Sequence, residues 1–164
     1  MDELLDLVNE KDEVIGEIWR SEIKGNPNSI HREIAILICD KNSRLLLQQR
    51  SLKKKSNPGI WTISCVGHIL KGDQPEATAH RELKEELGFD IALEFVKKDF
   101  EVSDGQKIFS YCYVGKYNGE KIVLQKEEVE QAKFFSKDEF FELEKTGKVE
   151  TGSAEWIREF WGIK

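Results

Sequence analysis

Short runs in which apolar residues alternate with polar ones predict a chain rich in β-strands. Residues 3–8 and 14–19 flank a polar turn and predict a hairpin, and residues 20–29 after it predict an irregular segment. Residues 34–39 are almost continuously apolar and predict a buried strand, which a turn joins to a second strand at 44–49. Further strands are expected at residues 60–66, 91–100, 107–117, 121–124 and 132–135, with a turn at 103–105 between the two longest.

Three segments carry helical signals instead. For residues 74–87, Asp73 and Glu76 predict an N-terminal capping box, Pro75 suits the first turn, and Gly88 is a natural left-handed stop. Ser136 and Glu139 form a second capping box before residues 137–145, and residues 153–161 carry an aromatic stripe typical of core packing. Strands interleaved with a few helices predict an α+β fold, a mixed sheet between helices.

The composition is that of an ordinary globular protein. A length of 164 residues suits one domain, and no apolar run approaches the roughly 18 residues needed to span a bilayer. The acidic start does not resemble a targeting segment, and three cysteines without CxxC spacing favour a reducing, cytoplasmic setting. The net charge of −6 argues against attraction to nucleic acid or anionic membranes.

Two charged segments stand out from this background. Residues 44–55 hold Arg44, Arg50, Lys53, Lys54 and Lys55 without an acid, which indicates either a solvated loop or a basic patch facing an anionic ligand. On the helix at 74–87, three carboxylates fall on one arc about 100° wide, beside an apolar stripe that would dock on a sheet. These are Glu82, Glu85 and Glu86.

The three carboxylates allow two interpretations. They are either the solvated face of a surface helix or ligands for a hard divalent cation, which would offset their mutual repulsion. Such a cation can neutralise phosphate charge and acidify an attacking water, and a carboxylate can accept the proton. Arg81 lies beside Glu85 at i,i+4 and can brace it.

The residues around this helix resemble the Nudix box. The order is Gly67, five residues, Asp73, seven residues, then Arg-Glu-Leu-Lys-Glu-Glu-Leu-Gly-Phe at 81–89, which matches eight of the nine fixed positions. The departure is Asp73, where the family has Glu, so the role of that position in the loop is in question. The resemblance, with flanking residues, covers roughly residues 30–145.

This resemblance implies a Nudix-type α/β/α sandwich and hydrolysis of a diphosphate bond in a nucleoside diphosphate-linked or related small molecule. It implies one domain over 1–164, comprising a hairpin extension at 1–30, the box at 67–89 and C-terminal helices at 136–164. The implied cofactor is Mg²⁺, with Mn²⁺ as a substitute. Its ligands would be Glu82, Glu85, Glu86, the carbonyl of Gly67, and a later carboxylate among Glu127, Glu128 and Glu130, of which Glu128 is favoured.

The catalytic group would then be Glu82, Glu85 and Glu86, with Arg81 orienting the carboxylates. Arg50 and one or more of Lys53, Lys54 and Lys55 are expected to contact phosphate. His68 is a further candidate for substrate binding. Whether the protein is a monomer or a homodimer stays open.

Two alternatives remain. Several residues resemble the isopentenyl diphosphate isomerase branch, but Val66 stands where that enzyme has its catalytic cysteine, and Cys65 one residue earlier should face the opposite side of the strand. His31 and His68 match two isomerase metal ligands, whereas Lys24 replaces the third, so both histidines are expected to be structural or substrate-facing. The other alternative is a non-catalytic ligand-binding module.

Overall fold

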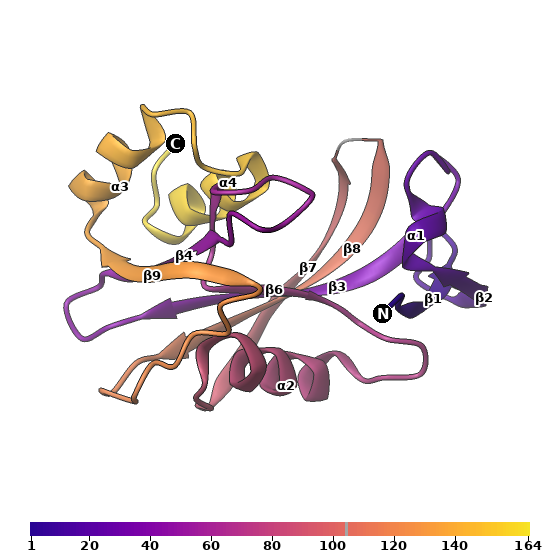
Figure 1. The fold of residues 1–164 in the computed structure, drawn as a ribbon, viewed down its shortest axis with the longest axis horizontal. Helices are drawn as coiled ribbons and strands as arrows, with labels where there is room; N and C mark the ends of the chain where they lie inside the picture. Colours follow the sequence, from indigo (N-terminus) through magenta and orange to yellow (C-terminus); the bar gives the residue numbers. More distant parts are fainter. Residues whose placement is uncertain (104) are drawn as a thin grey trace.

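A mixed β-sheet between helices forms the body of the protein (Figure 1). The computed structural model describes residues 1–103 and 105–164. Within them the main sheet has seven strands, and one helix covers one face while two helices cover the other. The predicted α+β fold is confirmed. The strands are β3 Ile30–Cys39, β4 Leu45–Arg50, β5 Trp61–Thr62, β6 Cys65–His68, β7 Leu93–Ser103, β8 Gln106–Lys116 and β9 Val129–Phe135.

Strand β3 is the centre of this sheet. It pairs in parallel with β8 over its whole length, and antiparallel with β6 along its middle and with β4 at its C-terminal end. Strand β9 extends the sheet beside β4, and β7 is the outer partner of β8. The run at 60–66 was expected to be one strand, but it divides at Ile63 and Ser64: β5 pairs with β4, and β6 pairs with β3.

The continuous apolar run in β3 is explained by burial on both faces. Ile34, Ile36 and Ile38 pack toward helix α2 Pro75–Leu87. Ala35 and Leu37 alternate with them and pack toward helices α3 Lys137–Glu144 and α4 Thr151–Phe160. Because successive side chains point to opposite faces of a strand, a strand covered on both sides is apolar at every position.

Helix α2 agrees with its predicted bounds within one residue, and one of its end signals was misread. The N-cap is Gln74, not Asp73, and its side chain makes no capping hydrogen bond. Asp73 instead lies 3.8 Å from the Arg81 guanidinium, so the predicted capping box is wrong. Pro75 is the first helical residue, and Gly88 ends the helix with φ 77°, donating its N–H to the Lys84 carbonyl.

The C-terminal helices α3 and α4 follow the sequence signals closely. Ser136 and Glu139 form the reciprocal capping box at the start of α3. Helix α4 begins two residues earlier than expected, because the Glu150 side chain accepts hydrogen bonds from the N–H groups of Gly152 and Ser153. None of the helices in the described residues is long and apolar enough to cross a membrane.

The N-terminal hairpin forms a separate two-stranded sheet of β1 Leu4–Val8 and β2 Val14–Trp19. Its turn is tied to the main sheet, because the Asp12 carboxylate accepts hydrogen bonds from Arg32 and Lys98. The segment after it was expected to be irregular, but it begins with a one-turn helix, α1 Arg20–Ile23, whose Ile23 is buried against the hairpin.

Two other expectations have different outcomes. Residues 121–124 form no strand, because Val123 donates its N–H to the Leu87 carbonyl and packs against the end of α2. The expected turn at 103–105 includes Asp104, which lies outside the described residues.

Candidate active site

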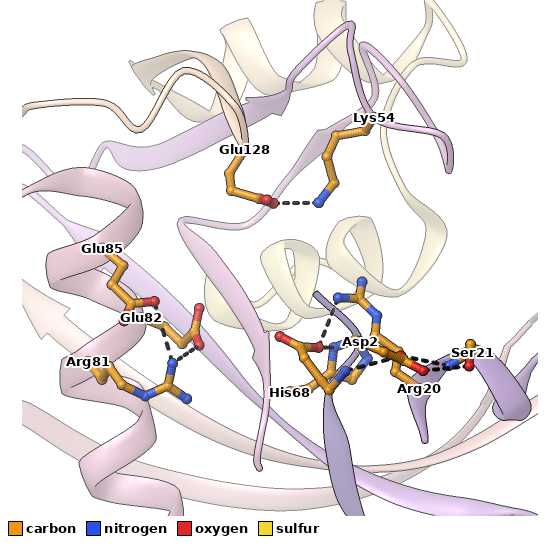
Figure 2. Close-up of polar contacts among 10 residues, drawn as sticks. Asp2, Arg20, Ser21, Lys54, His68, Arg81, Glu82, Glu85 and Glu128 are labelled. Atoms are coloured by element: carbon orange, nitrogen blue, oxygen red, sulfur yellow. Dashed lines mark hydrogen bonds and ion pairs between the residues drawn. The ribbon is translucent and has the colours of Figure 1, made fainter. Parts of the chain in front are cut away.

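A cavity of about 840 Å³ lies where α2, the loop after β4, the residues before β1, α1 and the start of α4 converge. Its wall includes Glu82, Glu85 and Glu86 from α2 and Gly67 and His68 from β6. Figure 2 shows charged groups on three sides of this space: Arg81, Glu82 and Glu85 on one, Lys54 and Glu128 on another, and His68 with Arg20 on the third.

Arg81 occupies the gap between two of the helix carboxylates. Its Nη1 lies 2.7 Å from Glu82 Oε1 and 3.4 Å from Glu85 Oε2 (Figure 2). The Glu82 side chain is 13% exposed, whereas that of Glu85 is 52% exposed. The guanidinium therefore braces one inner and one outer carboxylate, and its contact with Glu85 is the one expected from i,i+4 spacing.

Gly67 is required by the position of Glu82. A Cβ atom at residue 67 would lie 2.6 Å from both Cγ and Cδ of Glu82, which is closer than real Cβ contacts come. The glycine of β6 therefore lets the Glu82 side chain lie directly against the strand. A residue without a Cβ atom allows this close approach.

Glu86 is the most buried of the three carboxylates, at 7% exposed. Its Oε2 accepts a hydrogen bond of 3.0 Å from the Gln48 amide and one of 3.3 Å from the Cys65 thiol. Cys65 is fully buried, and it lies on the α2 side of the sheet while Val66 lines the cavity. The predicted opposite facing of Cys65 and Val66 is confirmed, but the contact between Cys65 and Glu86 was not predicted.

The helix carboxylates carry more negative charge than their surroundings offset. Burial, with repulsion from neighbouring carboxylates, raises the pKa of Glu82 to about 7, although Arg81 opposes the shift. Burial likewise raises the pKa of Glu86 to about 7, and the negative charge of Glu128 adds to this effect. Such a site gains from a cation.

These residues fit a hard divalent cation by their chemistry. The donors are carboxylate oxygens, the ligands that Mg²⁺ prefers, and Arg81 offsets only part of their charge. In the described part of the chain, no group of three or more His, Cys, Asp or Glu side chains is already close enough to hold a metal ion. Arg81 would therefore have to give way as the carboxylates turn toward the ion.

The basic loop after β4 contributes to the cavity through only some of its cations. Arg50 and Lys54 line the cavity, and Arg50 donates to the Ser56 carbonyl. Lys53 is exposed and pairs with Glu127 at 3.1 Å, and Lys55 is exposed outside the cavity wall. Arg50 and Lys54 are thus the members of the expected phosphate group that face this space.

Glu128 is the one of the three later acids that lines the cavity. Its carboxylate pairs with Lys54 Nζ at 2.5 Å (Figure 2), and its carbonyl accepts the N–H of Ser51. Glu127 is exposed, and Glu130 accepts a long hydrogen bond from the Leu52 N–H. Glu128 therefore lies in the cavity wall, and its role as a metal ligand stays a prediction.

The residues that flank the N-terminal hairpin supply a wall that sequence reasoning did not assign to the site. Glu3 accepts from Arg20 at 2.9 Å and lies 3.4 Å from His68 Nδ1. The hydrogen bond with His68 lowers the pKa of Glu3 to about 2. The ring centroid of His31 lies 5.3 Å from that of His68, with the two rings tilted relative to each other. His31 is fully buried, and this burial lowers its pKa to about 4. His31 thus lies in the core and His68 lines the cavity, and the expectation that both are structural or substrate-facing stays a prediction.

The far end of the cavity is acidic, and this too was not predicted. Glu33 accepts from the Ser110 hydroxyl, and burial raises its pKa to about 7. Glu101 and Glu150 lie close together around Gly152. These residues are far apart in sequence, so no spacing rule connects them. The only local signal is the charged Glu33 directly before the apolar run of β3.

Comparison with known proteins identifies the family. A model of the NUDIX domain matches residues 29–160, most of the chain. The chain belongs to the Nudix family. Its box, residues 67–89, contains the helix, the glycine and the arginine described above. The expected enzyme class, a Nudix hydrolase acting on acid anhydrides in phosphorus-containing compounds, is confirmed by this membership and by its similarity to named Nudix hydrolases.

Individual relatives carry two kinds of name. An uncharacterised Nudix hydrolase of Listeria monocytogenes is 33% identical over 87% of this chain and 85% of its own. Isopentenyl-diphosphate Delta-isomerase 2 of Photorhabdus laumondii is 43% identical, over 58% of this chain and only 54% of its own. In structure, the protein DR0079 of Deinococcus radiodurans has a TM-score of 0.83 at 20% identity, covering 97% of this chain and 99% of its own. This last likeness shows the fold alone.

Proposed function

We propose that this Nudix protein hydrolyses a diphosphate bond in a nucleoside diphosphate-linked or related small molecule, using Mg²⁺ or, in its place, Mn²⁺. The observation that carries the proposal is the opposition of charge across one cavity. The carboxylates of α2 face the cations Arg50 and Lys54, so a metal ion and phosphate oxygens can meet between them.

Each residue has a role in this proposal. Glu82, Glu85 and Glu86 hold the divalent cation, together with Glu128 and the Gly67 carbonyl. When bound, the cation supplies neutralisation of phosphate charge and a lower pKa for the attacking water.

The other roles belong to the chain itself. Arg50 and Lys54 bind and orient the phosphates, His68 contacts the substrate from the hairpin side, and Arg81 orients Glu82 and Glu85. One of the clustered carboxylates accepts the proton from water as it attacks phosphorus. Release of Lys54 from Glu128 would free the lysine for phosphate and the carboxylate for the metal. We also propose a cytoplasmic setting, since Cys39, Cys65 and Cys112 are all free thiols.

A substrate panel tests the proposal, and it should include nucleoside di- and triphosphates, nucleotide sugars, dinucleotides and prenyl diphosphates. With Mg²⁺ present, released phosphate or mononucleotide is the readout. For the best substrate, Glu85→Gln and Glu86→Gln should each lower turnover at least ~100-fold with the fold intact.

Glu76→Gln is the matched control, since Glu76 lies exposed in the first turn of the same helix and outside the cavity. It should retain full activity. Unchanged turnover in both Glu85→Gln and Glu86→Gln would refute the assignment.

Isomerisation of isopentenyl diphosphate is a second candidate, because the chain shares 43% identity with an isomerase over 96 residues. The site speaks against it: Val66 lines the cavity where a thiol would be needed, and Cys65 is buried on the α2 side. Formation of dimethylallyl diphosphate from isopentenyl diphosphate would favour this candidate. Inactivity on every diphosphate with both Mg²⁺ and Mn²⁺ would favour a ligand-binding module instead.

A further inference from the structure

Two side chains from different strands donate to the same oxygen of Glu86. Gln48 of β4 donates through Nε2 at 3.0 Å, and Cys65 of β6 donates through Sγ at 3.3 Å, both to Oε2. Throughout the described residues, Glu86 Oε1 accepts no hydrogen bond from a side chain. The two oxygens of this carboxylate therefore have different surroundings.

The orientation of the Gln48 amide is decided by Glu86. Gln48 is only 6% exposed, yet its Oε1 is buried with no hydrogen-bond partner in the described part of the chain. An amide with a purely structural role would be expected to satisfy both of its ends. Here only the end that faces the carboxylate is satisfied, and the side chain still forms part of the cavity wall.

Cys65 makes the same contact from the other side. It is fully buried in the core beneath α2, and its thiol is the second donor to Oε2.

We propose that Gln48 and Cys65 are positioning residues that hold Oε2 of Glu86 and leave Oε1 as the oxygen free to ligate the cation. This inference rests on the proposed function. A glutamate side chain held in one rotamer loses less freedom when it ligates, so groups behind a metal ligand strengthen binding without touching the ion.

Direct Mn²⁺ binding tests the proposal, measured from the free-ion electron paramagnetic resonance signal without substrate. Gln48→Leu and Cys65→Ala each remove one donor and should weaken Mn²⁺ binding about 10- to 100-fold. Gln48→Met, of similar length, provides a second variant at that position if the leucine variant does not fold. Circular dichroism and thermal unfolding of the metal-free proteins verify the fold.

Cys65→Ser separates positioning from packing. Serine keeps a donor in the same place, so this variant should bind Mn²⁺ within about threefold of the wild type, well above Cys65→Ala. If the cysteine only filled space, the serine variant would bind no better than the alanine variant, and that result would overturn the role of Cys65. Cys39→Ala and Gln131→Leu are matched controls outside the cavity wall, and both should bind as the wild type does.

The Glu86→Gln variant distinguishes failure of this inference from failure of the proposed function. Weaker Mn²⁺ binding in Glu86→Gln together with unchanged binding in Gln48→Leu and Cys65→Ala would overturn the positioning role alone. Unchanged binding in Glu86→Gln and Glu85→Gln would overturn the metal site itself, and the positioning role with it.

Discussion

At the scale of single residues, the chemistry of the site depends on side chains that approach each other more closely than sequence spacing could show. The helical arc of Glu82, Glu85 and Glu86 was predictable, because periodicity alone places them on one face. The burial of each carboxylate was not predictable from that spacing. It depends on β6, which lies against Glu82, and on β4, whose Gln48 donates a hydrogen bond to Glu86.

Replacing Gly67 by alanine should displace Glu82. The added Cβ would lie 2.6 Å from the carboxylate stem, so the side chain has to rotate away from the strand. We expect turnover of the Mg²⁺-loaded enzyme to fall by roughly 10- to 100-fold, the loss typical of disturbed ligand positioning. Steady-state kinetics on the best substrate of the panel measures it.

Gly16→Ala is the control for this substitution. Gly16 is also in a strand, and a Cβ there would meet only Leu7 at an ordinary 3.7 Å. The control should keep wild-type turnover. If Gly67→Ala also kept wild-type turnover, the present position of Glu82 would not be required for activity.

At the scale of elements, the sequence was most informative where an end signal has a single geometric meaning. Gly88 and the Ser136–Glu139 capping box mark helix ends that the structure reproduces. The capping box predicted at Asp73 was wrong. An aspartate before a helix can equally pair with an arginine two turns later, as Asp73 does with Arg81. The strand predicted at residues 121–124 was wrong, because the backbone of this segment forms a hydrogen bond with the end of α2 instead of with another strand.

The end of α2 provides a stability prediction. Gly88 has φ 77°, and a Cβ there would lie 2.7 Å from both Cβ and the carbonyl oxygen of Val123. Alanine should therefore cost the strain of a left-handed residue plus a backbone clash, in all about 2–4 kcal/mol of unfolding free energy. Urea denaturation measures this loss.

Comparison with Gly147→Ala separates the clash at residue 88 from the backbone strain. Gly147 has φ 70°, but no atom lies within 4 Å of the place that a Cβ would take, so only the backbone strain of about 1 kcal/mol should appear. Equal losses in the two variants would show that the segment at Val123 moves aside without cost.

At the scale of the whole molecule, the cavity combines residues that no local pattern connects. The layers were predictable from the apolar runs, since a strand buried on both faces needs helices on both sides. The residues of the cavity were not predictable from these runs, because Glu33 and Glu101 come together only through the long pairing of β3, β8 and β7. Its acidic end should have a measurable effect on stability.

The pKa of Glu33, raised to about 7 by burial, makes stability depend on pH. A raised carboxyl pKa means that the folded state holds the proton more tightly than the unfolded state. This contribution is complete below the unfolded pKa of about 4.5 and is lost as pH rises through about 7. Glu33→Gln cannot titrate, so its stability relative to the wild type should increase between pH 5 and pH 8, by at most about 3 kcal/mol.

Urea denaturation of both proteins at several pH values gives this difference. Glu82 and Glu86 titrate in both proteins, so their effects cancel in the comparison. Parallel stability profiles for the two proteins would contradict a raised pKa at Glu33.

Residues 1–28 lie outside the region that the Nudix model matches, which begins at residue 29, yet Glu3 and Arg20 line the cavity. The carboxylates of α2 and this part of the wall therefore come from separate parts of the chain. We expect that exchanging residues 1–28 between relatives changes which molecules bind and leaves the carboxylates of α2 in place.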